Sequence, residues 1–409
     1  MAKRSRLIVL GTMGRMPLAG VAWQCLHYLE GFRRLGFDVY YVEDTGQWSY
    51  DPRHNTLTAD CAYAVNYLAR VMEARGWGDR WAYRAARQGG RLYGLPERQF
   101  HRLFASAGAL VNLTAATVLR EEHRRVPVRV YLETDPVLPQ VRVARGDADY
   151  IEMLAAHTHH FSFGENLGAP DCGVPVERFR YRPTRQPVVL EWWAGGAAPG
   201  GLVPPRDCFT TIANWRQTEK DLEWQGESYT WSKHYEFLKF VALPRKTPQP
   251  LELALALKSD RACAGQGWEG LSEDDAATLR LLAEHGWRTV SGMRLSKNLA
   301  PYRDYILSSR GEFTVAKDQN VRLRSGWFSD RSACYLAAGR PVVTQDTAFG
   351  KFLPTGEGLF AFNTMAEILT AFDTINSAYE RHSRAARALA AEYFKAETVL
   401  ARLAAEAGL

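Results

Sequence analysis

Residues 310–362 read RGEFTVAKDQNVRLRSGWFSDRSACYLAAGRPVVTQDTAFGKFLPTGEGLFAF, and this stretch decides the fold. Its composition predicts a strand over Glu312–Ala316, a helix over Asp330–Ala338 and a second strand over Val342–Gln345. Gly339 follows the helix and suits a C-cap. Strand, helix and strand in this order indicate an α/β protein with a parallel sheet. Ligands of such sheets bind beyond the carboxyl ends of the strands, where helix N-termini favour anions, so we expect a phosphate-bearing ligand here.

Length and composition predict a two-domain globular protein. The chain has 409 residues, of which 46% are hydrophobic and 23% are charged. A domain takes roughly 100 to 200 residues, so two domains are expected. The net charge of +6 permits an anionic ligand or a polyanionic partner without requiring one. No apolar run approaches the roughly 18 residues of a membrane span, and we expect a cytoplasmic protein.

The cysteines and histidines do not predict a metal site. Neither a disulfide framework nor a zinc cage is indicated, because the six cysteines are scattered without a C-x-x-C pair. His157 and His159 would share one face of a strand, but no third ligand with suitable spacing is visible. We therefore expect no metal.

The N-terminal segment predicts a βαβ unit. A strand over Arg6–Leu10, a helix over Val21–Leu35 and a strand over Asp38–Glu43 follow one another. The intervening glycines do not form the motif G-x-G-x-x-G, so this unit gives only weak support to the alternative of a nicotinamide-dependent oxidoreductase. We expect the loop after the first strand to line a ligand cleft, with Gly11, Thr12 and Gly14.

A change of composition divides the chain. Repeated Pro and Gly with little periodicity mark residues 186–206 as a linker. Residues 1–185 then form a first Rossmann-like domain and residues 207–385 form a second. Alanine-rich amphipathic helices fill the tail, of which residues 386–409 form a C-terminal helix.

Residues 206–400 resemble the donor-binding half of bacterial GT-B glycosyltransferases, of the glycosyltransferase family 1 type and especially the CgeB-like group. The resemblance is carried by Asn214–Gln217, by Tyr229–His234 and by Arg310–Pro341 with Gln345–Thr347. It implies two Rossmann-like domains that face a cleft, with a C-terminal helical tail. It also implies metal-independent transfer of a sugar from a nucleotide diphosphate sugar such as a UDP-sugar (EC 2.4). The nucleotide sugar is then a co-substrate, and no cofactor is expected.

Cations at strand ends suit the chemistry of such a transfer. A departing nucleoside diphosphate develops negative charge, which Arg or Lys side chains neutralise. Related enzymes place an Arg after the first strand of the donor domain and a Lys before the following helix, and these roles fall on Arg216 and Lys233. Lys317 directly follows another strand and is a further candidate.

The loop before the predicted helix at 330 is the next candidate. Glycine would allow the main chain to approach the phosphates, and serine would cap the helix. Related retaining enzymes carry two glutamates eight positions apart here, whereas this chain has Gly326 and Cys334, so neither stereochemistry nor ribose recognition carries over. Asp330 or Asp346 could replace a missing carboxylate, although Asp330 also suits the first turn of a helix. The donor-site candidates of this region are Arg324, Ser325, Gly326, Ser329, Arg331 and Asp346.

Inverting transfer needs a general base for the acceptor hydroxyl. Asp135 is the first candidate, because it ends a strand and Pro136 disfavours a following helix. His157, His159 and His160 come next, although alternate histidines of a strand face opposite sides. Glu165 and Asp44 complete the candidates.

The acceptor stays open at this stage. A small molecule, a glycan, a protein or a hydroxymethylated DNA base would each supply a hydroxyl. The arginine-rich stretches 80–102 and 120–129 allow DNA. A non-catalytic module that binds a nucleotide sugar is the other alternative, because the paired glutamates are missing.

Overall fold

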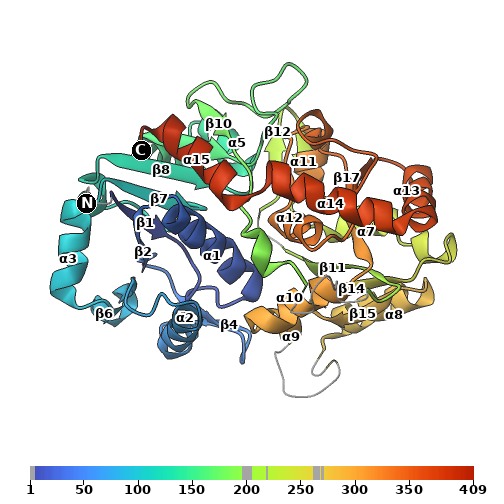
Figure 1. Ribbon diagram of the computed structural model, residues 1–409, viewed down its shortest axis with the longest axis horizontal. Coiled ribbons are helices and arrows are strands. Elements are labelled where there is room, and N and C mark those ends of the chain that lie inside the picture. Colours follow the sequence, from blue (N-terminus) through green and yellow to red (C-terminus); the bar gives the residue numbers. More distant parts are fainter. Residues whose placement is uncertain (1–4, 196–204, 218–219, 261–267, 269–270) are drawn as a thin grey trace. The chain divides into compact units, whose positions relative to one another are not determined.

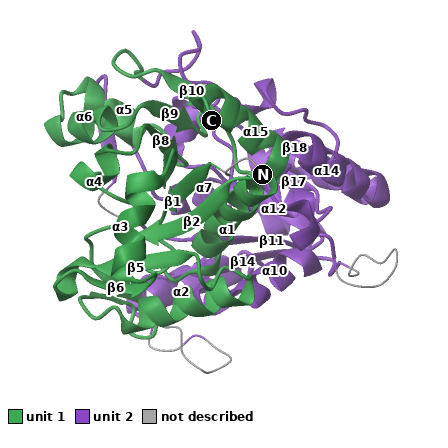
Figure 2. Cartoon of the chain, turned by 60° about the vertical axis from the view of Figure 1, so that its left-hand side comes forward, with its two compact units in different colours: residues 1–164, 175–187, 396–409 green, residues 165–174, 188–395 purple. Residues whose placement is uncertain are grey.

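The computed structural model describes the whole chain except residues 1–4, 196–204, 218–219, 261–267 and 269–270 (Figure 1). The chain divides into two compact units (Figure 2). Unit 1 comprises Met1–Gly164, Pro175–Pro187 and Ala396–Leu409, and unit 2 comprises Glu165–Val174 and Val188–Lys395. These units differ from the boundaries expected from the sequence in three places. Residues 165–174 group with unit 2, the expected linker over 186–206 divides at Val188, and the expected C-terminal helix over 386–409 divides at Ala396. The middle of the expected linker lies outside the described residues.

Unit 1 is built on an eight-stranded sheet in the order β10-β9-β8-β7-β1-β2-β5-β6. All neighbouring strands pair in parallel except β5 and β6. The expected strands over 6–10 and 38–43 are confirmed residue for residue. The strands are β1 (Arg6–Leu10), β2 (Asp38–Glu43), β5 (Trp81–Ala85), β6 (Arg91–Gly94), β7 (Ala109–Leu113), β8 (Val128–Glu133), β9 (His159–Ser162) and β10 (Tyr181–Pro183), with a separate hairpin of β3 (Ser49–Asp51) and β4 (Thr56–Thr58).

The helices of unit 1 include one from the far end of the chain. They are α1 (Ala19–Arg34), α2 (Ala62–Ala74), α3 (Glu97–Ser106), α4 (Glu121–Arg124), α5 (Leu138–Ala144), α6 (Ala148–Ala155) and α15 (Ala396–Ala407). Helix α15 packs closely on α1 at Gly31, where an added Cβ would lie 2.5 Å from Leu400 Cδ1. The absence of a side chain at this glycine allows the C-terminal helix to belong to unit 1.

Unit 2 is built on a six-stranded, fully parallel sheet in the order β15-β14-β11-β16-β17-β18. Its strands are β11 (Phe209–Asn214), β14 (Leu251–Ala256), β15 (Arg288–Ser291), β16 (Gly311–Thr314), β17 (Val342–Gln345) and β18 (Leu359–Phe362). A hairpin of β12 (Leu222–Trp224) and β13 (Glu227–Tyr229) is inserted after β11.

The helices of unit 2 follow the βα order expected from the sequence. They are α7 (His234–Lys239), α8 (Glu273–Glu284), α9 (Gly292–Ser296), α10 (Leu299–Ser308), α11 (Asp318–Arg322), α12 (Asp330–Ala337), α13 (Met365–Ser377) and α14 (Tyr379–Tyr393). Gly339 has a φ of 69° and ends α12 as predicted. Helix α11 was not expected, because its five residues are too few to show a helical period. Among the described residues, no helix is both long and apolar enough to cross a bilayer.

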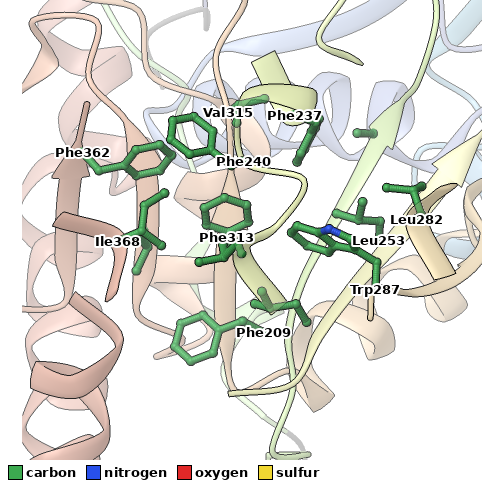
Figure 3. Close-up of a cluster of buried hydrophobic side chains, with 14 of the residues drawn as sticks. Phe209, Phe237, Phe240, Leu253, Leu282, Trp287, Phe313, Val315, Phe362 and Ile368 are labelled. Carbon is green, nitrogen blue, oxygen red and sulfur yellow. The ribbon is translucent and has the colours of Figure 1, made fainter. Parts of the chain in front are cut away.

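Aromatic side chains form the core of unit 2 (Figure 3). Phe313 of β16 stacks on Phe362 of β18 with ring centroids 5.6 Å apart, and Trp287 donates its indole N–H to Val241 O at 2.7 Å. Burial of each such side chain contributes about 1.5 to 3 kcal/mol. The core thereby fixes the strands whose carboxyl ends carry the candidate site.

Candidate functional site

The strand order of unit 2 reverses between β11 and β16. From β11 the chain proceeds to β14 and β15 on one side of the sheet, whereas β16, β17 and β18 lie on the other. Such a reversal marks the usual ligand position in open parallel sheets, beyond the carboxyl ends of the strands. Arg216 lies just beyond β11 and Lys317 just beyond β16. Two of the cations predicted to bind a diphosphate therefore flank this position.

A single serine joins the segments that carry Arg216 and Lys233. The Ser232 hydroxyl donates to Trp215 O at 3.1 Å and accepts from the Gln217 amide at 3.0 Å. The backbone on both sides of Arg216 thus contacts the residue that precedes Lys233. Burial, and then the charge of Arg216, lower the pKa of the neighbouring His234. Arg216 and Lys233 are therefore brought together although the β12–β13 hairpin separates them in sequence.

Two tryptophans hold the lysines of the site. Lys317 Nζ lies 3.2 Å from the ring centroid of Trp231, and Lys220 Nζ lies 4.7 Å from the same ring. Lys233 Nζ lies 5.0 Å from the ring centroid of Trp327. Lys317 is only 7% exposed, and cation–π contacts gain strength when the cation is desolvated. Neither tryptophan was assigned a role from the sequence, although both lie within the motifs that carry the resemblance.

The backbone of the loop before α12 is engaged within unit 2. The Ser325 amide donates to Asn320 O at 3.2 Å, and the Gly326 amide donates to Thr347 O at 2.7 Å. The Ser325 hydroxyl donates to Asn320 Oδ1 at 2.8 Å. These donors are therefore already bonded to α11 and to the turn after β17, and the roles of Ser325 and Gly326 toward a ligand stay predictions.

Ser329 and Asp346 lie at turns of the same edge. Ser329 is buried and occupies the N-cap position of α12, with its hydroxyl 3.5 Å from Asp330 Oδ1. Asp346 follows β17 and accepts the Ala348 amide at 2.9 Å. Asp346 therefore shapes the turn after β17, and its role toward a ligand stays a prediction.

Arg331 points into the sheet. Strands β11 and β16 pair only at their first residues, whereas β11 pairs with β14 along its whole length. The Arg331 guanidinium fills the opening: Nη1 donates to Ile212 O at 2.6 Å, Nη2 donates to Thr314 Oγ1 at 3.0 Å, and Nε donates to the fully buried Glu312 at 2.6 Å. These contacts replace ladder hydrogen bonds that the two strands lose. The geometry gives Arg331 a structural role, which the sequence did not predict.

In unit 1, the loop after β1 closes on a carboxylate. The Glu43 carboxylate accepts hydrogen bonds from the amide of Gly14, at 2.7 Å, and from the amide of Arg15. The Tyr41 hydroxyl accepts a hydrogen bond from the Met13 amide at 2.7 Å. Burial raises the pKa of Glu43 to about 7, against the effect of these amides. The amides that a dinucleotide phosphate would need are therefore occupied, which argues against the oxidoreductase alternative.

Asp135 lies in a strained turn at the carboxyl end of β8. Val137 has a φ of 94°, a conformation that a β-branched residue rarely adopts, and it is fully buried. Gln140 holds the turn, because its Oε1 accepts the Val137 amide at 2.7 Å and its Nε2 donates to Glu133 at 2.8 Å. Asp135 itself is half-buried. Asp135, the first candidate for the general base, therefore lies in a turn that hydrogen bonds hold in place.

The other base candidates lie elsewhere. His159 begins β9 and pairs in register with Val130, so it lies away from the carboxyl end of the strands. Its neighbour His157 is buried, where Nδ1 contacts Met153 O at 2.8 Å, and burial lowers its pKa to about 4. Glu165 belongs to the segment that groups with unit 2. The catalytic roles of His159 and Glu165 stay predictions.

One group of the described residues has the spacing of metal ligands: Asp44, Glu122 and His123. Its two carboxylates are already paired: Asp44 contacts Arg120 and lies 3.4 Å from Arg84 Nε, and Glu122 Oε1 lies 2.7 Å from Arg84 Nη2. His123 Nδ1 accepts the Arg120 amide at 3.0 Å. Because two guanidinium groups already neutralise these carboxylates, we assign no metal here.

Comparison with known proteins shows the fold. No protein-family model and no curated protein matches this sequence. Anabaena HepE in complex with UDP and glucose matches with a TM-score of 0.54 at 13% identity, over 98% of this chain and 99% of that chain. An alpha-glucosyltransferase in complex with UDP and a 13-mer DNA containing an A:G mismatch matches with a TM-score of 0.57 at 11% identity, over 99% and 100%. Sucrose-phosphate synthase from Thermosynechococcus elongatus matches with a TM-score of 0.50 at 12% identity, over 98% of both chains.

The chain has the GT-B fold. The fold class predicted from the sequence is thereby confirmed. The match to these GT-B structures covers nearly the whole chain, so both units take part in it. At these identities the likeness concerns the fold alone.

Proposed function

We propose that the protein is a glycosyltransferase that moves a sugar from a nucleotide diphosphate sugar, most simply a UDP-sugar, to an acceptor hydroxyl. One observation carries the proposal: the segments of Arg216 and Lys233 meet at Ser232 beside the strand reversal that Lys317 also flanks. A diphosphate leaving group needs such a concentration of positive charge. HepE and the alpha-glucosyltransferase bind UDP on the same fold.

We further propose that transfer needs no metal ion, because three cations from unit 2 can neutralise the diphosphate. In this proposal unit 2 binds the donor, and Asp135 of unit 1 accepts the proton of the attacking hydroxyl. The segments Asn214–Gln217 and Tyr229–His234 support membership of the CgeB-like group.

A titration with UDP tests the donor site. At a hundredfold excess over Kd, UDP should stabilise the protein by roughly 2.7 kcal/mol. Arg216→Ala and Lys233→Ala should each weaken UDP binding by about tenfold or more without changing the melting temperature of the unliganded protein. Arg288→Ala and Lys246→Ala are matched controls, because both side chains are exposed and lie at or before the amino ends of β15 and β14. Equal UDP affinity in all four variants would reject the assignment.

Release of UDP from UDP-sugars separates an enzyme from a binding module. Incubation with UDP-glucose and a pool of hydroxyl acceptors should produce UDP, by transfer or by slow hydrolysis. Tight binding of UDP-glucose with no release of UDP under any acceptor would instead identify a nucleotide-sugar-binding module.

A further inference from the structure

A segment of ten residues that interrupts unit 1 belongs to unit 2. We call the segment Glu165–Val174 the strap. It follows β9, and the residues on both sides of it, Gly164 and Pro175, belong to unit 1 (Figure 2). The strap contacts the loop between α11 and α12, which carries four of the residues predicted to bind the donor.

The strap donates hydrogen bonds to three consecutive carbonyl groups of that loop. Gly173 N–H donates to Leu323 O at 3.0 Å. Asn166 binds the next two carbonyls: its Nδ2 donates to Arg324 O at 2.8 Å, and its amide donates to Ser325 O at 3.1 Å. Asn166 is 1% exposed, so these bonds are shielded from water. The carbonyl direction of the loop is therefore set by the strap.

This contact explains an unusual backbone. Arg324 and Gly326 have φ values of 51° and 78°, in the left-handed region that most residues avoid. A Cβ on Gly326 would lie 2.4 Å from Asn166 N and 2.8 Å from Asn166 Cβ. Glycine is required here because the strap lies against it. The sequence alone had suggested a ligand as the reason.

The strap also holds the side chain of Arg324. Asp171 Oδ2 accepts from Arg324 Nε at 3.0 Å, and Asp171 Oδ1 contacts Lys351 Nζ. Lys351 in turn donates to Asn166 Oδ1 at 3.2 Å. One half-exposed carboxylate thus contacts two cations, one that follows β16 and one that follows β17. Lys351 was not singled out from the sequence, because nothing in its neighbourhood marks it.

We propose that Asn166 and Asp171 are positioning residues of the donor site. Asn166 sets the backbone of residues 323–326, and Asp171 directs Arg324 and Lys351 toward one anionic ligand, the diphosphate of the donor. This inference rests on the proposed function. A strap that only stabilised the fold would affect the melting temperature and leave UDP affinity unchanged.

UDP affinity, measured by isothermal titration calorimetry on the full chain, tests the inference. Asn166→Ala and Asp171→Asn should each weaken UDP binding about fivefold to twentyfold. Glu177→Gln is the control for loss of a carboxylate, because Glu177 is exposed and lies just beyond the strap. In a double-mutant cycle, Asp171→Asn and Arg324→Gln together should cost less affinity than the sum of the two single losses, since both changes remove the same ion pair. The further loss that Asp171→Asn adds to Arg324→Gln reflects the release of Lys351.

Three outcomes would overturn the inference. If the parent protein binds UDP and both Asn166→Ala and Asp171→Asn bind it within twofold of the parent, the positioning role of the strap is rejected and the proposed function stands. Additive losses in the Asp171 and Arg324 cycle would reject positioning of Arg324 by Asp171. A parent protein that binds no UDP would reject the proposed function, and the inference with it.

Discussion

Arg331 Nε lies 2.6 Å from Glu312 Oε1 in the opening between β11 and β16. Both side chains are removed from water, with side-chain exposures of 11% and 0%. Arg331 also binds Ile212 O and Thr314 Oγ1, so one guanidinium joins two strands that do not pair with each other at this point. The separation of these strands at the strand reversal therefore depends on an ion pair.

Arg331→Met should destabilise the protein by about 3 to 5 kcal/mol, because it leaves the Glu312 charge buried and unpaired. Urea unfolding followed by circular dichroism measures the change. The double variant Arg331→Met with Glu312→Gln should recover part of the loss. Parent-like stability with lost UDP affinity would contradict this account and favour the ligand role predicted from the sequence.

Lys317 should contribute more to donor binding than its neighbour Lys220. Lys317→Met should weaken UDP binding about tenfold or more, because its buried charge lies beside the strand reversal. Lys220→Met is the matched control, since Lys220 contacts the same Trp231 ring but is exposed. Equal effects of the two substitutions, read from UDP titrations, would contradict the assignment of Lys317.

Asp135→Asn should lower the rate of transfer by about a hundredfold or more while leaving UDP affinity unchanged. Asparagine keeps the size of the side chain but cannot accept the proton of the acceptor hydroxyl. Initial rates of UDP release with a saturating donor measure the effect, and Asp149→Asn, on α6, is the control. Full turnover in Asp135→Asn would exclude Asp135 as the base.

The buried Glu43 should make stability depend on pH. Its pKa is raised from 4.5 to about 7 in the folded state, so folding favours the protonated form. The resulting contribution to stability is fully present below pH 4.5 and is lost as the pH rises through about 7. Relative to Glu43→Gln, the parent should lose about 1 to 3 kcal/mol between pH 4.5 and pH 8. Urea unfolding of both proteins at several pH values checks this, and parallel curves would contradict the burial effect.

DNA should bind weakly. Five arginines of the arginine-rich stretches form ion pairs within the protein, which lowers the positive charge that they offer to phosphate: Arg80 with Asp38, Arg84 with Glu122, Arg120 with Asp44, Arg124 with Glu152, and Arg125 with Glu121. We expect a Kd weaker than about 10⁻⁴ M for duplex DNA at physiological salt. Fluorescence anisotropy with a labelled duplex measures it, and tight, steeply salt-dependent binding would restore the DNA acceptor.

The elements of the sheets could be predicted because their signals are local. Strands β1, β2 and β17 were expected at their observed residues, and Gly339 marked the end of α12. Two contacts could not be predicted. Arg331 binds the buried Glu312 of β16, although its position before a helix suggested a ligand, and Gly326 packs against Asn166, which is distant along the chain. A charged residue near a loop looks the same in sequence whether it faces a ligand or a buried carboxylate.

Signals along the sequence predict the α/β order of strands and helices, and they place cations directly after the strands. Those features arise from hydrophobic periods and turn residues within a few positions of one another. The tertiary structure sets the partner of each cation. Ser232 joins the segments of Arg216 and Lys233, Arg331 binds Glu312 within the sheet, and Arg324 pairs with Asp171 of the strap. The physical reason is that pairing of charges depends on distance in space, and the fold sets that distance between residues far apart in the chain.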